Sequence, residues 1–374
     1  MRIAKGNTTN TVSMSKEAMK KRIKAVRRQL IGKKIDCLIV TKPANVTYTT
    51  GFMGDDSWAV ISNRAVYLLT DSRYTEQAQK ECVGCRIIRR TNSLAEAVAK
   101  LLKQLKSVRT VCVEKSTSVA AFEALKKHIK LRLKTTAGII ESVRRTKDSS
   151  EVAVIKAAAS ISARALRQTL RYIKPGVTEN ELAGMLDFQI RKLGATNSFD
   201  TIVAFGPNAS RPHHQPSKRR LKKRDTVLID FGARYKGYCS DITRSFAVGR
   251  PTRFFERVYD AVQQAQAAAI KMIKAGAEIQ QVDAAAREVI SKSDLPVYGH
   301  GTGHGFGLEI HELPFLKADG KGKLRAGEVL TIEPGVYIPG KLGVRIEDDF
   351  LVTDTGCRIL THNCPHSPLL LHLR

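Results

Sequence analysis

Two pairs of acidic residues stand out in the sequence, because the two members of each pair are spaced so that they face one another across a β-hairpin. Asp230 ends the apolar segment TVLID, and Asp241 follows eleven residues later, with Tyr235, Lys236 and Gly237 as turn material between them. In an antiparallel hairpin closed near positions 235 and 236, position 230 lies opposite position 241, with Cβ atoms about 5 Å apart. Two carboxylates this close repel one another and raise a pKa unless they share a cation or a proton. The spacing therefore predicts a cation site.

A second acidic pair repeats this arrangement with glutamates. Glu333 and Glu347 flank a turn centred on Gly340, and this predicts a second hairpin with facing carboxylates. Between the two hairpins lies the segment HGTGHGFGLEIHE, residues 300–312, whose glycines let the backbone approach other segments closely. The imidazoles that this segment offers are those of His300, His304 and His311.

The four carboxylates together with His304 indicate a particular kind of metal centre. The set is too anionic for a single zinc ion, but it suits two divalent cations bridged by carboxylates and a water. Oxygen-rich ligands favour Mn²⁺ or another hard to borderline ion, and Co²⁺, Fe²⁺ and Zn²⁺ remain open because geometry does not dictate the choice. Two cations about 3.5–4 Å apart lower the pKa of a bridging water and stabilise a tetrahedral oxyanion. Amide hydrolysis needs both effects.

An internal repeat indicates how the chain positions these residues. The segment 173–178 recurs as 273–278, one hundred residues later, and each copy joins two helical patterns that are followed by strands. Thr178 and Glu181 also have the spacing of a capping box for the second helix of the first pair. We therefore expect an α+β region of two related α-α-β-β halves, with a cleft where they meet.

The N-terminal part of the chain has a different pattern. Residues 15–145 alternate between helical segments and strand-like runs such as IDCLIV, WAVISN and AVYLLT, with a turn region between the first two runs. This alternation predicts an α/β domain. The charged stretch 142–151 marks its end, which assigns residues 146–374 to a second domain. Residues 1–14 are expected to form a polar extension.

Charge and cysteine content restrict the partners and the compartment. The formal net charge is +28, and the first 150 residues hold 31 Lys and Arg against 12 Asp and Glu. Such a surface can bind nucleic acid non-specifically, but no RNA-recognition signature or zinc finger accompanies it. The seven cysteines are scattered along the chain and favour a reducing compartment. With no apolar run long enough for a membrane span and no secretory signal, we expect a cytoplasmic protein without a membrane partner.

Three motifs resemble those of the pita-bread metallopeptidases, specifically the branch that contains aminopeptidase P and prolidase. They are IDFGARYKGYCSDITRSF, HGTGHGFGLEIHE and TIEPGVYIPGKLGVRIEDDFLVT. The resemblance spans roughly residues 15–374 and implies a creatinase-like α/β domain, residues 15–145, followed by a catalytic pita-bread domain, residues 146–374, with an internal pseudo-twofold repeat. It also implies a dinuclear exopeptidase that releases the N-terminal residue from Xaa-Pro peptides.

The resemblance implies a role for each of the five metal ligands. Asp230 and Asp241 would bind the first metal ion, and His304 and Glu333 would bind the second. Asp241 and Glu347 would bridge the two ions.

The resemblance also places residues around the substrate. Glu333 would be the general base that delivers a proton to the leaving amine, and His311 would bind the substrate carbonyl or stabilise the tetrahedral intermediate. His213, in GPNASRPHH, matches a histidine that contacts substrate near the scissile bond, whereas His214 does not follow the proline directly. The two remaining matches, near the pocket and the metal ligands respectively, are His300 and Arg345.

Several alternatives stay open beside aminopeptidase P. Prolidase, which acts on dipeptides, has the same motifs. Methionine aminopeptidase fits less well because Glu347 follows Glu333 after only fourteen residues and an N-terminal domain is present. Creatinase lacks the metal set. A basic pita-bread protein acting as an RNA-binding module is the alternative outside enzymology. The resemblance further implies a homodimer.

Overall fold

The structure, a computed structural model, describes residues 15–365 and 370–371, so the predicted extension at residues 1–14 lies outside the described residues. The chain divides into two compact units between Arg144 and Arg145. Each unit has its own sheet system and its own buried core. Within the described ranges, none of the helices combines the length and the apolar character that a membrane span requires.

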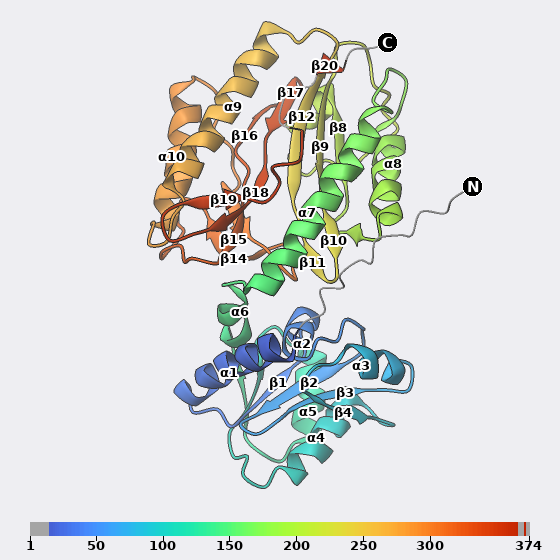
Figure 1. The fold of residues 1–374 in the computed structure, drawn as a ribbon, viewed down its shortest axis with the longest axis vertical. Coiled ribbons are helices and arrows are strands. Elements are labelled where there is room, and N and C mark those ends of the chain that lie inside the picture. The colour runs from blue at the N-terminus through green and yellow to red at the C-terminus, as the bar shows by residue number, and fades with distance from the viewer. Residues whose placement is uncertain (1–14, 366–369, 372–374) are drawn as a thin grey trace, which may run out of the picture. The chain divides into compact units, whose positions relative to one another are not determined.

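The N-terminal unit is built on one six-stranded sheet with the order β4-β3-β2-β1-β5-β6 (Figure 1). The central strand β1 pairs antiparallel with β2 and parallel with β5, so the sheet is mixed. The strands are β1 (Cys37–Val40), β2 (Trp58–Ser62), β3 (Val66–Thr70), β4 (Arg86–Arg89), β5 (Val111–Glu114) and β6 (Leu133–Thr136). The helices are α1 (Lys16–Gly32), α2 (Pro43–Thr50), α3 (Thr75–Glu81), α4 (Leu94–Gln104), α5 (Val119–His128) and α6 (Ile139–Arg144). This is the α/β fold that the alternating pattern predicts.

One helix of this unit differs from the sequence-based expectation. The stretch between β1 and β2 reads as a turn region, yet it contains α2. Pro43 stands in the first turn of that helix, where its missing N–H needs no partner, and Gly51 ends the helix in the left-handed conformation with φ 84°. The β-branched residues between these two positions hide the helical signal, because they are weak helix formers.

The second unit consists of two halves of similar construction, and Figure 1 shows α7 and α8 beside the strands of the first half and α9 and α10 beside those of the second. The first half contains α7 (Ser149–Leu170), α8 (Glu179–Lys192), β7 (Thr196–Asn197), β8 (Ile202–Phe205), a 3₁₀ helix η1 (Gly206–Ser210), β9 (Thr226–Phe231), β10 (Ala233–Tyr235), β11 (Tyr238–Cys239) and β12 (Ile242–Val248). The second half contains α9 (Arg253–Met272), α10 (Ile279–Lys292), β13 (Gly303–Gly305), β14 (Glu312–Leu316), β15 (Val329–Ile332), β16 (Gly335–Ile338), β17 (Leu342–Arg345), β18 (Asp348–Val352) and β19 (Cys357–Ile359), and β20 (Leu370–Leu371) returns to pair with β12.

The main sheets run β20-β12-β9-β8 in the first half and β14-β13-β15-β18-β19 in the second. Smaller sheets, β11-β10-β7 and β16-β17, continue the two long hairpins at their tips. The predicted α+β fold with two related halves is therefore confirmed.

Backbone hydrogen bonds repeat from one half to the other at the predicted repeat. Gly176 N donates to Leu221 O at 2.8 Å, and Gly276 N donates to Leu324 O at 2.9 Å. Isolated bridges follow at matching places, one from Thr178 and the other from Glu278. The repeated segment thus joins each helix pair and ties it to the loop before the next strand.

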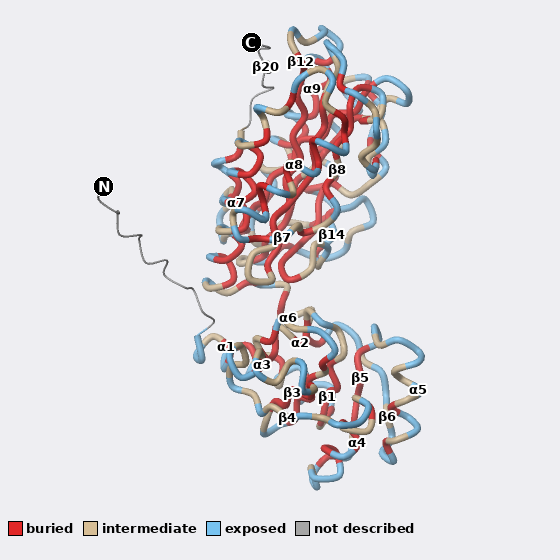
Figure 2. Tube along the Cα trace, turned by 90° about the vertical axis from the view of Figure 1, so that its right-hand side faces the viewer, coloured by how far each residue is buried: buried red, intermediate tan, exposed pale blue. Residues whose placement is uncertain are grey.

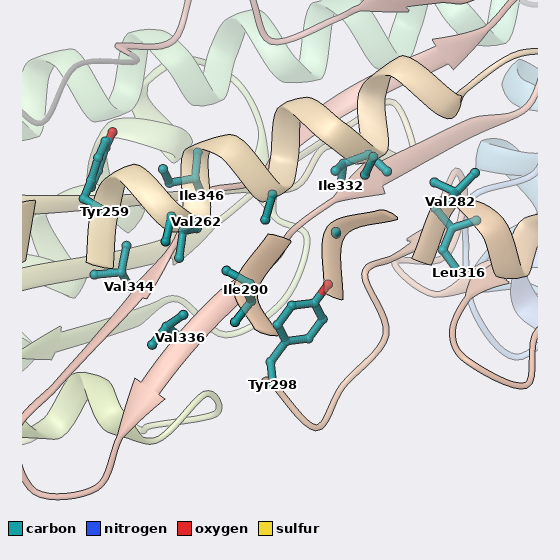
Figure 3. Packing of buried hydrophobic residues seen from close by; sticks show 14 of the residues in the cluster. Tyr259, Val262, Val282, Ile290, Tyr298, Leu316, Ile332, Val336, Val344 and Ile346 are labelled. Carbon is teal, nitrogen blue, oxygen red and sulfur yellow. The ribbon is translucent and has the colours of Figure 1, made fainter. Parts of the chain in front are cut away.

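Each half buries its own apolar core between its helix pair and its sheet, so the buried residues of Figure 2 are concentrated along the strands and the inner faces of the helices. Figure 3 shows the second core, where Val262 of α9 and Ile290 of α10 pack with strand residues such as Val336 and Val344. The first core has the same construction, with Leu166 and Leu186 from its helices among the buried strand residues. The two packed layers hold the hairpins rigidly, and the acidic pairs sit on these hairpins.

Candidate metal centre and active site

The first acidic pair lies on the β9–β12 hairpin, but its register differs from the prediction. Asp230 pairs with Thr243, not with Asp241. The turn explains the difference, because Lys236 and Gly237 both have positive φ, 47° and 83°, and form a two-residue tip. The hairpin therefore closes one position later than predicted. Asp241 becomes a diagonal neighbour of Asp230, a separation that still allows two side chains to interact across strands.

The second acidic pair has the predicted register. Ile332 pairs with Asp348 on one side, and Gly335 pairs with Arg345 on the other. Glu333 and Glu347 therefore face one another between these two ladders. The tip lies beyond the Ile338–Leu342 pair, as the sequence predicts.

The glycines of the 300–312 segment are required by close backbone contacts. A Cβ atom on Gly303 would lie 1.9 Å from Thr331 O, and one on Gly305 would lie 2.3 Å from Leu313 O. Side chains at either position would push β13 away from β14 and β15. His304, between the two glycines, is thereby held in the middle of the sheet.

Three of the predicted ligands converge. Asp241, His304 and Glu347 each offer one ligand atom, and these atoms all lie within 4.8 Å of one another. His304 Nε2 is 3.6 Å from Asp241 Oδ2 and 3.5 Å from Glu333 Oε1. The other ring nitrogen, Nδ1, donates to Gly305 O at 3.1 Å, which leaves Nε2 as an acceptor facing the carboxylates.

The chemistry of this cluster fits divalent metal ions. Asp230 Oδ1, Asp241 Oδ1 and Glu347 Oε1 are buried and have no hydrogen-bond partner among the described residues. Burial first, and then the neighbouring carboxylates, raise the pKa values of Asp241 and Glu347 well above their usual range, and burial raises the pKa of Glu333 to about 8. Burial lowers the pKa of His304 to about 4, so its imidazole is neutral, as a ligand must be. Cations would satisfy the unpaired oxygens and remove the repulsion.

Arg345 links two of the carboxylates. Its Nη2 donates to Asp230 Oδ2 at 2.6 Å, and its Nε donates to Thr243 Oγ1 at 3.0 Å. Thr243 Oγ1 in turn donates to Glu347 Oε2 at 2.6 Å. A further bond joins Arg345 Nη1 to the hydroxyl of Tyr337 at 2.7 Å. The guanidinium therefore fixes the orientation of Asp230 directly and that of Glu347 through Thr243.

The four histidines that line the same cavity as His304 occupy different environments. His311 is exposed, and its ring centroid lies 4.5 Å from that of His304. His213 is exposed, whereas His214 is turned inward and buried. His300 Nε2 hydrogen bonds with the Tyr337 hydroxyl at 2.9 Å, so this imidazole joins the Arg345 network.

All nine predicted site residues line one cavity of about 740 Å³. The metal-ligand cluster lies on its buried side, while the exposed His213 and His311 lie on the side that a ligand can reach. Burial lowers the pKa of His311, so His311 is neutral near pH 7. Neutral imidazoles beside a carboxylate cluster can donate N–H groups to a carbonyl oxygen of a bound peptide.

Two residues of this site, Thr243 and Tyr337, are not among the residues predicted from the sequence. Thr243 lies two positions after Asp241, and Tyr337 lies four positions after Glu333. The alternation of side chains along β12 could have indicated Thr243, since residues two apart share a face. Nothing in the sequence pattern marks Tyr337, whose partner Arg345 reaches it across the β16–β17 hairpin.

Comparisons with known proteins agree with this geometry. Residues 153–354 match the family described as Metallopeptidase family M24, and residues 22–146 match the Creatinase/Prolidase N-terminal domain. The chain is 40% identical over 332 residues to the uncharacterized peptidase YqhT of Bacillus subtilis (strain 168), an alignment that covers 88% of this chain and 94% of that protein.

Solved structures extend the likeness over both units. An Xaa-Pro dipeptidase from Bacillus anthracis has a TM-score of 0.90 and 37% identity, covering 94% of this chain and 99% of that one. An X-Pro aminopeptidase from Thermotoga maritima MSB8 has a TM-score of 0.85 and 34% identity, covering 92% and 99%. With a family match over more than half of its length and both domains present, the chain belongs to metallopeptidase family M24, as its motifs predict.

Proposed function

We propose that the protein is a two-metal exopeptidase that releases the N-terminal residue from peptides with proline in the second position, as aminopeptidase P does. The observation that carries this proposal is the buried carboxylate cluster around His304, in which three oxygens have no hydrogen-bond partner within residues 15–365 and 370–371. Membership of family M24 supports the reaction class. The names of two solved neighbours, an Xaa-Pro dipeptidase and an X-Pro aminopeptidase, support the preference for proline.

In this proposal the five ligands divide between two divalent ions. Asp230 and Asp241 would hold the first ion and His304 and Glu333 the second, and Asp241 and Glu347 would serve as ligands to both. For these ions we propose Mn²⁺; when bound, they would supply a water of lowered pKa and a Lewis acid for the scissile carbonyl. Co²⁺, Fe²⁺ and Zn²⁺ share some of these ligand preferences with Mn²⁺ and remain alternatives.

The protein's own groups then orient the peptide and move protons. Glu333 takes the proton released as the carbonyl carbon is attacked and delivers it to the departing amine. His311, neutral near pH 7, donates an N–H to the carbonyl oxygen and so stabilises the charge that develops there. His213 contacts the peptide near the scissile bond. Arg345 and His300 act indirectly, because their hydrogen bonds fix Asp230 and Tyr337.

Prolidase activity is the alternative, since the same centre would hydrolyse a dipeptide. We further propose that the active protein is a cytoplasmic homodimer, with residues 15–145 as its N-terminal domain and residues 146–374 as its catalytic domain. Every residue with a proposed role lies in the second of these. The basic charge of the first 150 residues motivates a less favoured alternative, non-specific binding of RNA.

One assay tests the chemistry and its subclass together. Metal-stripped protein is reloaded with Mn²⁺ or Co²⁺ and assayed on an Xaa-Pro dipeptide, an Xaa-Pro-Yaa tripeptide and a matched Xaa-Ala peptide. We expect metal-dependent cleavage of the proline peptides, faster for the tripeptide. A faster dipeptide reaction would indicate prolidase. Folded, metal-loaded protein without cleavage would contradict the proposal, and steeply salt-dependent RNA binding by that protein would favour the alternative.

A further inference from the structure

Glu179 is a buried carboxylate that the proposed chemistry does not use. It is the first residue of α8, its exposed fraction is 0%, and its two oxygens accept five hydrogen bonds. Oε1 accepts from Phe205 N at 2.8 Å and from Asn208 Nδ2 at 2.8 Å. Oε2 accepts from His214 Nε2 at 2.8 Å and from Ser217 N at 3.0 Å and Oγ at 2.5 Å. All four partners come from one segment, residues 205–217.

The charge of Glu179 strengthens this set of bonds. Burial alone would raise its pKa, but hydrogen bonds from His214, Ser217 and Asn208 outweigh burial and lower the pKa below its usual value. The carboxylate is therefore ionised near neutral pH, and bonds to an ionised acceptor are shorter and stronger than neutral ones. Its place at the N-terminus of α8 also favours a negative charge.

The segment that Glu179 holds carries His213 into the cavity. His213 lies between Asn208 and Ser217, and its neighbour His214 is the imidazole that binds Glu179. Within the segment, His214 N donates to Arg211 O at 3.1 Å, which closes a turn around His213. Both histidines border the cavity, but His214 is buried and bonded to Glu179, whereas His213 is exposed.

The repeat indicates that the fold itself does not require a carboxylate here. The equivalent position of the second half, one hundred residues later, is Ile279, and its backbone makes the matching bond to Gly322 O at 3.0 Å. In the first half, Glu179 N bonds Arg219 O at 3.2 Å. The helix and loop therefore join in the same way with an apolar side chain. What the first half gains from Glu179 is the anchoring of residues 205–217.

We propose that Glu179 is a positioning residue of the active site: its carboxylate anchors residues 205–217 and thereby sets the position of His213 against the bound peptide. The inference rests on the proposed function, because it takes from that function the role of His213 as a substrate contact. Misplacing a substrate-binding group by about 1 Å costs on the order of 100-fold in rate.

Glu179→Gln is the most informative substitution. It keeps the shape of the side chain, but each of the two carboxylate oxygens accepts from a backbone N–H, Phe205 on one side and Ser217 on the other. In either orientation of the amide, its NH₂ group replaces an oxygen that accepts from a backbone N–H. Two donors cannot bond one another, so one of the two backbone hydrogen bonds must break. Glu181→Gln is the matched control, because Glu181 lies two residues along the same helix and its carboxylate accepts from Thr178, which lies outside residues 205–217.

The test compares full-length Mn²⁺-loaded variants. For Glu179→Gln we expect unchanged metal content, faster amide exchange across residues 205–217, and a fall of about 10–100-fold in kcat/KM for the Xaa-Pro-Yaa peptide. In a His213→Ala background the same substitution should cost almost nothing further, since the two act as a unit. Glu181→Gln should leave amide exchange in that segment and kcat/KM unchanged.

Several results would overturn the inference. If the two losses in kcat/KM multiply fully when Glu179→Gln is combined with His213→Ala, Glu179 does not act through this segment. Wild-type amide exchange in Glu179→Gln would show the same. If Glu179→Gln does not fold, Ser217→Ala removes one of the five bonds to Glu179, together with the bond that Arg219 N donates to Ser217 Oγ at 3.1 Å. It should give a smaller loss that also disappears in the His213→Ala background. If the wild-type protein cleaves no Xaa-Pro peptide, the proposed function fails. Amide exchange and the His213 imidazole NMR signal then decide whether the anchoring itself exists.

Discussion

The two halves of the catalytic unit share a backbone scheme but differ in how they place carboxylates. The first half puts Asp230 and Asp241 on a diagonal of its hairpin, whereas the second half puts Glu333 and Glu347 directly opposite one another. The helix pairs differ as well, since Glu179 anchors a loop in the first half and Ile279 replaces it in the second. The repeat therefore supplies the scaffold, and individual side chains on it supply an asymmetric site.

The second half has its own buried acid one turn further along its helix. Asp283 of α10 accepts from Thr302 N at 3.1 Å and from Thr302 Oγ1 at 2.8 Å, and it pairs with Arg287. Arg287 also donates to the carbonyl oxygen of His300. Each half thus uses one helix-borne carboxylate to hold the loop that carries its histidines. The two loop-holding carboxylates, Glu179 and Asp283, stand at different positions of the repeat. The position of one of them therefore does not predict the position of the other.

Hydrogen bonds also join the two halves at the candidate metal site. Arg345 of the second half bonds Asp230 of the first, and Thr243 of the first half bonds Glu347 of the second. Arg345 Nε and Thr243 Oγ1 close the network at 3.0 Å. A predicted metal ligand in either half is therefore oriented by a residue from the other half.

The largest effect is expected from removing a carboxylate that contacts both proposed metal positions. Asp241→Ala should lose metal, measured by elemental analysis after dialysis, and peptidase activity should fall by more than about 1,000-fold, because the metal supplies the nucleophile and the Lewis acid. Glu347→Ala should behave alike, although it comes from the other half. A variant of either kind with normal turnover would contradict the assignment of that residue.

The next effect tests the bracing between the halves. Thr243→Val keeps the shape of the side chain but removes the hydroxyl that joins Arg345 to Glu347. We expect a loss of about 10–100-fold in metal affinity or activity, typical of residues that orient metal ligands. Thr243→Ser keeps the hydroxyl and is the matched control. If Thr243→Val and Thr243→Ser are equally active, the halves do not depend on this contact.

Burial of the acidic cluster predicts a pH dependence for metal-free protein. Glu333 has a raised pKa of about 8 in the folded state, against 4.5 for an ordinary Glu. Between these values the folded state binds more protons than the unfolded state, so stability falls as pH rises, by about 1.4 kcal/mol per pH unit for each such group. The unfolding temperature of metal-free protein should therefore fall between about pH 4.5 and 8 by about 3 °C per unit.

Glu333→Gln should remove the contribution of one group and so make this slope shallower in the metal-free protein, while Asp241 and Glu347, whose pKa values are also raised, keep part of it. Metal-loaded protein should not show the slope, because cations neutralise the cluster. Calorimetry at several pH values measures both. A metal-free stability that rises over this range would show that Glu333 is ionised in the folded state and that the cluster is less repulsive than its burial indicates.

Local sequence patterns predicted the parts of this molecule that local chemistry determines. The Gly340 tip, the capping box at Thr178 and the close approach at Gly303 follow from turn, cap and glycine rules applied to neighbouring residues. The first hairpin was displaced because a choice between two adjacent turn positions decides the whole register. The roles of Glu179 and Thr243 depend on partners up to about a hundred residues away, and no short motif records such contacts.

The smallest effect compares the helix starts of the two halves. Thr178 caps α8, because its Oγ1 accepts a hydrogen bond from Glu181 N at 3.1 Å. In return, Thr178 N donates to Glu181 Oε2 at 2.8 Å. Glu278 stands at the same place before α10, where its side chain makes no cap bond within the described part of the chain. Its carboxylate forms an exposed ion pair with Lys323 at 3.4 Å. Thr178→Ala should cost about 1 kcal/mol of stability, whereas Glu278→Ala should cost only a few tenths.

Denaturant unfolding of the metal-loaded variants at equal concentration measures this difference, provided that the slope of the transition is unchanged. Equal losses would show that the helix starts are held by the repeated backbone bonds at Gly176 and Gly276, with the side chains adding nothing. The expected inequality would instead show that the first half needs a firmer start to α8. A well-fixed first turn of α8 is needed because Glu179, the next residue, must keep its carboxylate within hydrogen-bond distance of five donors.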